Sequence, residues 1–370
     1  MECLSGVDFV YFIGIENDEF RDYAPRLIPY FPRIDGLVSA AKDPGLLARG
    51  EKVLGRPVEI VHPLKVIQRA RKGRVLLVDF TADLVSNLMV KSLLSENVVR
   101  RDYIRAIREA DLGHTYVLMR DEQAYLREHR SEFAKLAERL SDDFSRAVLV
   151  ARMKAYETLD RSELLAIRLP SNLEYFNPGG SPHSISLGEN ETFVDVGGAY
   201  GDSVFRFVEF THGKYNKIYS FEPDKRNFQK LDLLRTFIPN LETFNCFLGG
   251  SVGEVDFFEN PVNSFGSNAF NAAQYPELTK KIPMMRLDDI VENATILKMD
   301  VEGAETQVIG GATKLIAQKA PAMAVTCYHF PQDPLEIYDA VMSLHSYKVC
   351  KLRHFSGNLN DMSFVFSDRA

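Results

Sequence analysis

The stretch ETFVDVGGAYGDSVFRF, residues 191–207, decides the fold of the second half of the chain. Its apolar run ends in an acid, then breaks into small residues, and continues with apolar residues at helical spacing. A buried strand, a glycine turn and a helix form the opening unit of a doubly wound α/β sheet. Ligands of such sheets bind beyond the carboxyl ends of the strands, so this turn is also the first candidate for a binding site.

The spacing of the small residues distinguishes between ligands. A dinucleotide fold requires G-x-G-x-x-G at this turn. Here the small residues are Gly197, Gly198, Ala199 and Gly201, and the x-x-G step is missing. The pattern acid-x-G-x-G-x-G fits better, with Asp195 in front and alanine in place of one glycine. Enzymes that use S-adenosyl-L-methionine (SAM) have this turn, because the ribose and the amino-acid carboxylate of the ligand lie against bare backbone.

An acid at the end of the next predicted strand supports the same ligand. Glu222, in YSFEPD (219–224), lies at about the distance, roughly 20 residues, at which a ribose-binding acid follows such glycines. Asp195 is placed to anchor the cationic amine of the ligand through its backbone or a water. The predicted cofactor-binding residues are Asp195, Gly197, Gly198, Ala199, Tyr200, Gly201, Asp202, Glu222 and Pro223.

Several motifs in this half resemble the FkbM-type family of SAM-dependent methyltransferases. They are FVDVGGAYGDS (193–203), SFEPDKRNF (220–228), LKMDVEGAE (297–305) with VIGGA after it, and the late YH (328–329) and RHFS (353–356). DVEGAE is the most specific of them, and the resemblance covers about residues 170–367. It implies a class I methyltransferase domain: a seven-stranded doubly wound sheet with an antiparallel last strand. It also implies O-methylation of sugars and other hydroxyl-bearing natural products.

Alternating strands and helices define the predicted α/β architecture and its domains. We expect a Rossmann-like N-terminal domain (1–118), a helical linker (119–170) and the methyltransferase domain (171–370), opened by the turn cluster NPGGSP (177–182). The expected strands of the last domain are 191–197, 217–223, 241–248, 295–301, 321–328, 347–352 and 362–367, with helices over 202–210, 225–237, 304–318 and 333–344. Between the third and fourth strands we expect one short strand and a loop.

The first domain shows a strand-helix alternation of its own but a different turn. Its predicted strands are 7–15, 34–40 and 74–80. After the first strand, GIENDEF (14–20) keeps a single glycine, and its three acids would repel a phosphate. We therefore expect a Rossmann-like module that binds no dinucleotide. It could shape an acceptor cleft or mediate homodimer formation, and the sequence does not choose between these roles.

Composition limits the partners. A net charge of -7, from 44 basic and 51 acidic residues, argues against a nucleic-acid partner. No apolar run approaches the roughly 20 residues of a membrane helix. The N-terminus lacks the basic region of a signal peptide, so we expect a soluble, cytoplasmic protein without membrane insertion. Cys3, Cys246, Cys327 and Cys350 have no paired spacing, which favours reduced and mostly buried thiols.

Methyl transfer to a hydroxyl needs an aligned acceptor and a group that removes its proton. The predicted catalytic residues are Asp300 and Glu302, which follow the fourth strand, and His329, which follows the fifth. A histidine suits the general base because its ordinary pKa lies near neutrality. Asp300 can also cap the helix that follows it, and Arg353 could hold an anionic part of the acceptor.

A divalent metal is compatible with the acids but is not predicted. Asp300, Glu302 or the pair Asp288 and Asp289 could supply oxygen ligands. One acid of that pair is expected to cap a helix, and a complete ligand set is not evident in the sequence.

Three functions remain in order of preference. The first is a SAM-dependent O-methyltransferase that acts on a saccharide or glycosylated metabolite in polysaccharide or natural-product biosynthesis. The second is a methyltransferase-fold scaffold without catalysis, which would not need to keep both Asp195 and Glu222. The third is a nicotinamide-dependent oxidoreductase that uses the first domain, and the missing glycines after its first strand argue against it.

Overall fold

The computed structural model describes residues 6–31, 33–41, 43–110, 117–177, 181–261, 264–357, 359 and 361–369. The chain divides into two compact units, each with its own sheet. The N-terminal unit comprises Met1–Ala124, Ala147–Arg168 and Ser356–Leu359, and the C-terminal unit comprises Tyr125–Arg146, Leu169–Phe355 and Asn360–Ala370. The domain limits 1–118, 119–170 and 171–370 stay a prediction. Cys3 and residues 178–180 of the NPGGSP cluster lie outside the described residues.

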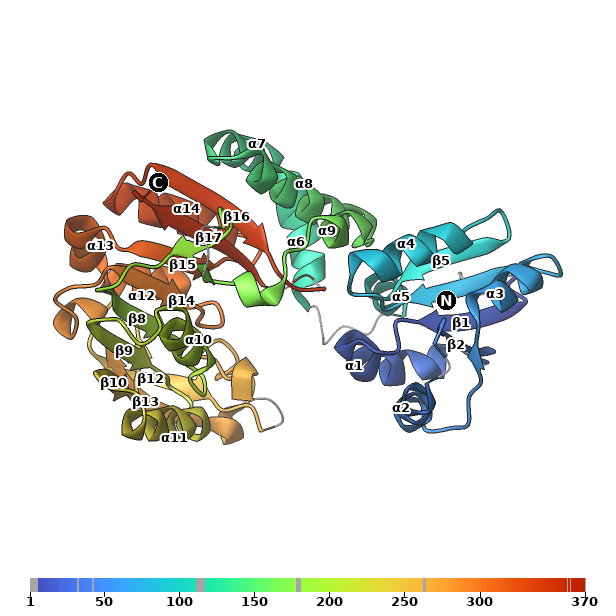
Figure 1. Ribbon diagram of the computed structural model, residues 1–370, viewed down its shortest axis with the longest axis horizontal. Helices are drawn as coiled ribbons and strands as arrows, with labels where there is room; N and C mark the ends of the chain where they lie inside the picture. The colour runs from blue at the N-terminus through green and yellow to red at the C-terminus, as the bar shows by residue number, and fades with distance from the viewer. Residues whose placement is uncertain are drawn as a thin grey trace. The chain divides into compact units, whose positions relative to one another are not determined.

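The N-terminal unit is built on a five-stranded parallel sheet of order β3-β2-β1-β4-β5 (Figure 1). Its strands are β1 (Phe9–Ile13), β2 (Gly36–Val38), β3 (Ile60–Val61), β4 (Val75–Asp79) and β5 (Val98–Asp102). Its helices are α1 (Asp18–Leu27), α2 (Pro44–Leu54), α3 (Pro63–Ala70), α4 (Leu84–Leu93) and α5 (Tyr103–Glu109). A Rossmann-like parallel sheet was expected, but β3 and β5 were not.

Local sequence sets the helix ends in this unit. Asp43 accepts a hydrogen bond from the backbone N–H of Gly45, and Pro44 starts α2 where no N–H is needed. The same helix stops at Gly55, whose φ of 64° is the left-handed conformation that glycine adopts without steric cost. The carboxylate of Asp83 likewise accepts from the N–H of Ser86 at the start of α4.

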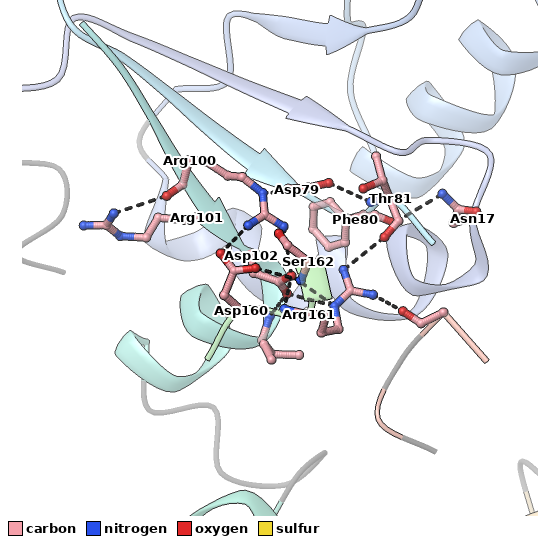
Figure 2. Close-up of polar contacts among 12 residues, drawn as sticks. Asn17, Asp79, Phe80, Thr81, Arg100, Arg101, Asp102, Asp160, Arg161 and Ser162 are labelled. Carbon is pink, nitrogen blue, oxygen red and sulfur yellow. Dashed lines mark hydrogen bonds and ion pairs between the residues drawn. The ribbon is translucent and has the colours of Figure 1, made fainter. Parts of the chain in front are cut away.

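A buried network of charges ties the end of the N-terminal sheet to residues 160–162, as Figure 2 shows. Arg100 of β5 donates to Asp79 Oδ2 at 2.6 Å and to Asp102 Oδ2 at 3.2 Å. Arg161, which is fully buried, donates from Nε to both carboxylate oxygens of Asp102, at 3.0 and 3.1 Å. The guanidinium of Arg161 also donates to the carbonyl oxygens of Thr81 and Gly357. Every buried charge named here therefore has an opposite charge beside it, as buried ions require.

Four further helices follow. They are α6 (Val117–Glu128), α7 (Arg130–Arg139), α8 (Asp143–Thr158) and α9 (Ser162–Ala166). None of the helices in the described part of the chain has the length and hydropathy that a bilayer crossing requires.

The C-terminal unit contains the expected seven-stranded sheet, in the order β10-β9-β8-β14-β15-β17-β16 (Figure 1). Its strands are β8 (Thr192–Val196), β9 (Lys217–Phe221), β10 (Leu241–Phe244), β14 (Ile296–Met299), β15 (Ala322–Thr326), β16 (Val349–His354) and β17 (Met362–Ser367). β17 is antiparallel to both of its neighbours, and the pairs among β10, β9, β8, β14 and β15 are parallel. The predicted fold class is confirmed.

The helices that connect the strands of this sheet cover both of its faces. They are α10 (Asp202–Phe210), α11 (Lys225–Leu233), α12 (Glu305–Gly311), α13 (Thr313–Lys319) and α14 (Asp333–Leu344). α10 and α11 pack on one face through a core that includes Phe193, Phe207 and Leu231. The chain turns in the opposite direction at β14, so right-handed crossovers place α12 and α13 on the other face. β8 and β14 are therefore the neighbours at which the direction of winding reverses.

The expectation of one short strand and a loop between the third and fourth strands is wrong. A small sheet of order β11-β13-β12 occupies this part, with β11 (Phe247–Leu248), β12 (Gly253–Phe258) and β13 (Thr279–Met285). The stretch predicted as one strand over 241–248 divides into β10 and β11. The short strands β6 (Phe176–Asn177) and β7 (Ile185–Ser186) form a further pair. The 3-10 turns are η2 (Ile28–Tyr30), η3 (Ser171–Leu173), η4 (Leu234–Thr236), η5 (Ser264–Gly266), η6 (Pro276–Leu278) and η7 (Leu287–Asp289).

Candidate functional site

A cavity lies beyond the carboxyl ends of β8, β9 and β14, at the point where the winding reverses. It holds about 810 Å³ of space when its open mouth is counted, which is within the range of roughly 300–1,000 Å³ for small-molecule sites. Turn residues after the three strands line it together with residues of β11, β12 and the segment 264–267. Its position is the one expected for the ligand of an open α/β sheet.

The glycine turn after β8 packs directly against the turn after β14. A Cβ atom on Gly197 would lie 1.8 Å from the carbonyl oxygen of Asp300, so a side chain cannot be accommodated there. A Cβ atom on Gly198 would lie 2.2 Å from the hydroxyl oxygen of Ser220. The missing side chains of these glycines thus allow the backbone to pack closely against its neighbours, as well as allowing a ligand to lie against the turn. Ala199 occupies a left-handed conformation with a φ of 45°, which costs alanine about 1–2 kcal/mol relative to glycine.

Glu222 presents its carboxylate to the cavity, and backbone amides hold it in place. Its Oε2 accepts from the N–H of Ala199 and its Oε1 from the N–H of Asp224, each at 2.8 Å. A carboxylate has about four lone-pair sites, so two remain for hydroxyl donors. Burial raises the pKa of Glu222 to about 8, although the two amides favour the charged form. Ligand donors would shift this pKa back down.

Asp195 has a structural partner that the sequence did not reveal. Lys298 of β14 lies opposite it in the sheet, and the Nζ of Lys298 is 3.4 Å from Asp195 Oδ1. The other carboxylate oxygen of Asp195 accepts from the hydroxyls of Ser203 and Ser220, at 2.9 and 2.8 Å. Burial alone would lower the pKa of Lys298, but the attraction of Asp195 and Asp300 outweighs it and raises this pKa. Asp195 therefore organises the start of α10 and the neighbouring strands.

The structure brings most of the predicted residues to the cavity. The residues that line it include Gly197, Ala199, Asp202, Glu222, Pro223, Asp300 and Glu302. Asp195, Gly198, Tyr200, Gly201 and His329 are not among the described lining residues. The sequence missed Tyr175, Asn227 and Lys298, which also line the cavity. A lysine in the apolar strand ILKM was the available signal, because a buried ammonium needs a carboxylate partner.

The three predicted catalytic residues, Asp300, Glu302 and His329, lie close together at the turn after β14. The Nε2 of His329 is 3.9 Å from Asp300 Oδ1 and 3.8 Å from Glu302 Oε2. Its Nδ1 is 3.2 Å from Oε1 of Glu305, at the start of α12. Glu302 and Gly303 both have left-handed backbones, with φ of 54° and 92°, and this turn brings residue 302 back toward residue 300. Strained conformations of this kind accumulate at functional sites.

The pKa values change the expected roles of these residues. Burial alone would lower the pKa of His329, but Glu305, Glu302 and Asp300 raise it to about 10. Such an imidazole holds its proton at neutral pH, which argues against the role of general base considered above. Burial raises the pKa of Glu302 to about 7, while His329 opposes this shift. Tyr175 donates from its hydroxyl to Asp300 Oδ2 at 3.0 Å and fixes that carboxylate.

Two other polar candidates have structural partners. Arg353 is 1% exposed and donates to Asp142 Oδ2 at 2.6 Å, so its guanidinium is not available to an acceptor. Asp288 accepts from the backbone N–H groups of Lys314 and Leu315 at 3.0 and 2.9 Å, as a helix cap does. Cys246, Cys327 and Cys350 are buried and unbridged.

The segment 264–270 contributes to the cavity wall. Ser264 and Ser267 line the cavity. The Ser267 hydroxyl donates to Asp224 Oδ2 at 2.8 Å, which ties the segment to the start of α11. Phe270 packs edge-on against Phe330, with 4.6 Å between the ring centroids.

A model of the FkbM methyltransferase domain matches residues 195–349. This range runs from the acid before the glycine turn to the start of β16, so it contains the turns after β8, β9 and β14 that build the cavity. Residues 195–349 form an FkbM methyltransferase domain. Methyl transfer is therefore the reaction class, and the cavity at the carboxyl ends of its strands is the place where the FkbM domain would bind its ligands.

Among solved structures, methyltransferase FkbM from Methylobacillus flagellatus KT is similar over 99% of this chain and 92% of its own, with a TM-score of 0.71 and 22% identity. The shared fold thus extends beyond the FkbM domain to the N-terminal α/β unit. Aeropyrum pernix fibrillarin, solved with natively bound S-adenosyl-L-methionine, has a TM-score of 0.32 and 13% identity, covering 50% of this chain and 68% of that one. A putative rRNA methylase from Clostridium thermocellum has a TM-score of 0.31 and 10% identity over 48% and 86% of the two chains. No curated protein sequence matches this chain significantly.

Proposed function

We propose that the FkbM domain transfers the methyl group of SAM to a hydroxyl of a saccharide or glycosylated metabolite, as a step in polysaccharide or natural-product biosynthesis. The observation that carries the proposal is the Glu222 carboxylate at the cavity, held by the amides of Ala199 and Asp224 with lone pairs to spare. Two adjacent ribose hydroxyls are the donors that such a carboxylate suits. Gly197 and Pro223 supply side walls without donors or charges.

The residues on either side of the cavity divide the work of methyl transfer. SAM supplies an electrophilic methyl group when it is bound. Asp202, Glu222 and the turn around Gly197 would hold the cofactor. Asp300, Glu302 and His329 would orient the acceptor hydroxyl, and the two carboxylates would provide negative charge where its proton is lost. The small-molecule acceptor would enter through the open mouth of the same cavity.

Calorimetry with SAM and with S-adenosylhomocysteine tests the cofactor. We expect micromolar binding to the full chain and a loss of about 1–3 kcal/mol of binding free energy in Glu222→Ala, because the ribose hydroxyls lose a charged acceptor. Glu254→Ala, an exposed acid of the same unit, is the control. If neither ligand binds and Glu222→Ala changes nothing, the chain is a scaffold and the enzyme proposal fails.

The acceptor is identified by transfer of label. Incubation of the protein and methyl-labelled SAM with sugar nucleotides, glycans and glycosylated metabolites should label a hydroxyl-bearing compound. Label confined to compounds without sugar hydroxyls would contradict the saccharide part of the proposal and leave the cofactor part standing. Neither test depends on the expected cytoplasmic location or on the expected formation of a homodimer.

A further inference from the structure

The carboxylates beside the proposed acceptor position are arranged around a gap. His329 Nε2 faces Asp300 Oδ1 at 3.9 Å and Glu302 Oε2 at 3.8 Å. These separations are too long for hydrogen bonds. They match two ligands of one cation, because metal-ligand bonds of about 2.0–2.2 Å place neighbouring ligand atoms roughly 3–4 Å apart. One ligand atom from each of the three residues lies within 4.8 Å of the others.

The histidine supplies an independent indication of a ligand. Its side chain is nine-tenths buried, and Nε2 has no hydrogen-bond partner among the described residues. Nδ1 lies 3.2 Å from the Glu305 carboxylate, which favours a proton on Nδ1. With that proton on Nδ1, the lone pair of Nε2 points into the gap between the two carboxylates, in the direction that a ligand of a cation there requires. Histidines that bind metals characteristically donate the other ring N–H to a carboxylate.

Neighbouring groups hold two of the three side chains in place: Asp300 directly, and His329 through Glu305. The Tyr175 hydroxyl fixes Asp300 through Oδ2 and leaves Oδ1 toward the gap. The Glu305 carboxylate is held in turn by the Thr326 hydroxyl at 2.9 Å and by the N–H of Val301 at 3.1 Å. Supporting contacts of this kind orient the ligands of metal sites.

A second group of possible ligands, Glu305, His329 and Asp333, is less suitable. It would use Nδ1 of His329. Glu305 and Asp333 are 1% and 4% exposed, and neither is among the described residues that line the cavity. Asp300 and Glu302 do line it, so an ion and an acceptor can reach them together.

We propose that Asp300, Glu302 and His329 bind a divalent cation of the manganese type, which holds the acceptor through two adjacent oxygens. Two carboxylates and one imidazole suit a cation that prefers oxygen and accepts nitrogen. Three protein ligands leave about three positions of an octahedral ion open, enough for a vicinal pair of hydroxyls.

The catalytic part of this inference rests on the proposed methyl transfer, whereas binding of the cation does not. Coordination lowers the pKa of a hydroxyl, as it does for water. The hydroxyl proton passes to water, the acceptor oxygen forms a bond to the methyl carbon, and the carbon-sulfur bond breaks with its electron pair going to sulfur. The products are the methyl ether, S-adenosylhomocysteine and a proton, so charge and atoms balance.

Manganese binding to the full chain tests the site directly. After treatment with a chelator and its removal, we expect one Mn²⁺ per chain by calorimetry. Glu302→Gln and His329→Gln should each weaken binding about tenfold or more. Glu292→Gln, an exposed acid of the same unit, should bind as the unchanged chain does. The pulsed electron paramagnetic resonance spectrum of bound Mn²⁺ should show coupling to one histidine nitrogen, and His329→Gln should lack it.

Each outcome decides between the two proposals. The metal site is overturned if Mn²⁺ does not bind, if both variants bind Mn²⁺ as tightly as the unchanged chain does, or if the spectrum lacks nitrogen coupling. The last measurement needs no variant, so a misfolded variant cannot obscure the answer. S-adenosylhomocysteine affinity is measured on the same samples. Cofactor binding without Mn²⁺ binding leaves the proposed methyl transfer intact, and Mn²⁺ binding without cofactor binding or labelled product removes the proposed function but not the site.

Discussion

Binding of the proposed cofactor should release a proton from Glu222. Burial raises the pKa of this carboxyl to about 8, so most molecules carry it protonated at neutral pH. Ribose hydroxyls donate to the ionised carboxylate, and this favours the charged form in the complex. The pKa therefore falls on binding, and affinity increases as the pH rises toward 8. Below the pKa each molecule must first lose the proton, which costs about 1.4 kcal/mol for each pH unit.

The magnitude follows from this single pKa. Between pH 6 and 7 the affinity should rise about ninefold, between pH 7 and 8 about fivefold more, and above pH 8 by less than about twofold. At pH 7 about 0.9 protons should leave for each ligand bound. Calorimetry in two buffers with different ionisation enthalpies measures this number directly.

Glu222→Gln is the matched control, because an amide keeps the shape of the side chain and carries no titratable proton. The amino group of the ligand titrates in both proteins, so it cancels when the two are compared. We expect the variant to bind more weakly and to lose the dependence assigned to Glu222. If the ratio of the two affinities stays constant from pH 6 to 8, then the amides of Ala199 and Asp224 already keep the carboxylate ionised in the free protein. The reasoning from burial would then be refuted.

Three further substitutions test the packing around the site and the N-terminal unit. Lys298→Met should lower the free energy of unfolding by about 3–5 kcal/mol in urea titrations, because the Asp195 carboxylate stays buried without the Lys298 ammonium. Adding Asp195→Asn to this variant should restore part of the lost free energy. Ala199→Gly should leave the free energy of unfolding unchanged or raise it by up to about 1 kcal/mol, because it removes the strain at a φ of 45°. A clear loss of stability would contradict this. Arg161→Lys should speed amide hydrogen exchange in β4 and β5, since an ammonium cannot reproduce the planar set of donors by which Arg161 reaches Asp102, Thr81 and Gly357. Unchanged exchange would show that the network adds no local stability.

Local patterns were sufficient for most of the sheet. The helix expected over 202–210 begins and ends at those residues, because a positive-φ glycine precedes an amphipathic run. β13 was missed for a physical reason. TKKIPMM contains two exposed lysines and a proline, and its strand conformation depends on pairing with β12, whose partner residues lie 21 to 31 positions earlier in the chain. Pairing at that distance leaves little trace in local periodicity.

The candidate site was predictable to the extent that its residues follow strand ends. Glu222 and Asp300 could be placed at the same edge of a parallel sheet without coordinates. Contacts that depend on the register between strands could not be predicted from the sequence. Lys298, for example, faces Asp195 although more than a hundred residues separate them in the chain. Arg353, which was expected to contact the acceptor, instead donates to Asp142 and so joins β16 to the residues just before α8. Such pairings are decided by tertiary packing.

One contact explains why the two most informative motifs lie together in the cavity. Gly197 opens the turn assigned to the cofactor, and the carbonyl oxygen of Asp300 fills the space of its missing side chain. The carboxylate of the same Asp300 faces the gap assigned to the cation. In-line methyl transfer tolerates little error, since a misplacement of about 1 Å can cost about a hundredfold in rate. A side chain at position 197 would push the two turns apart and so displace donor and acceptor together. The glycine therefore fixes the distance between two half-sites, and neither motif alone would do so.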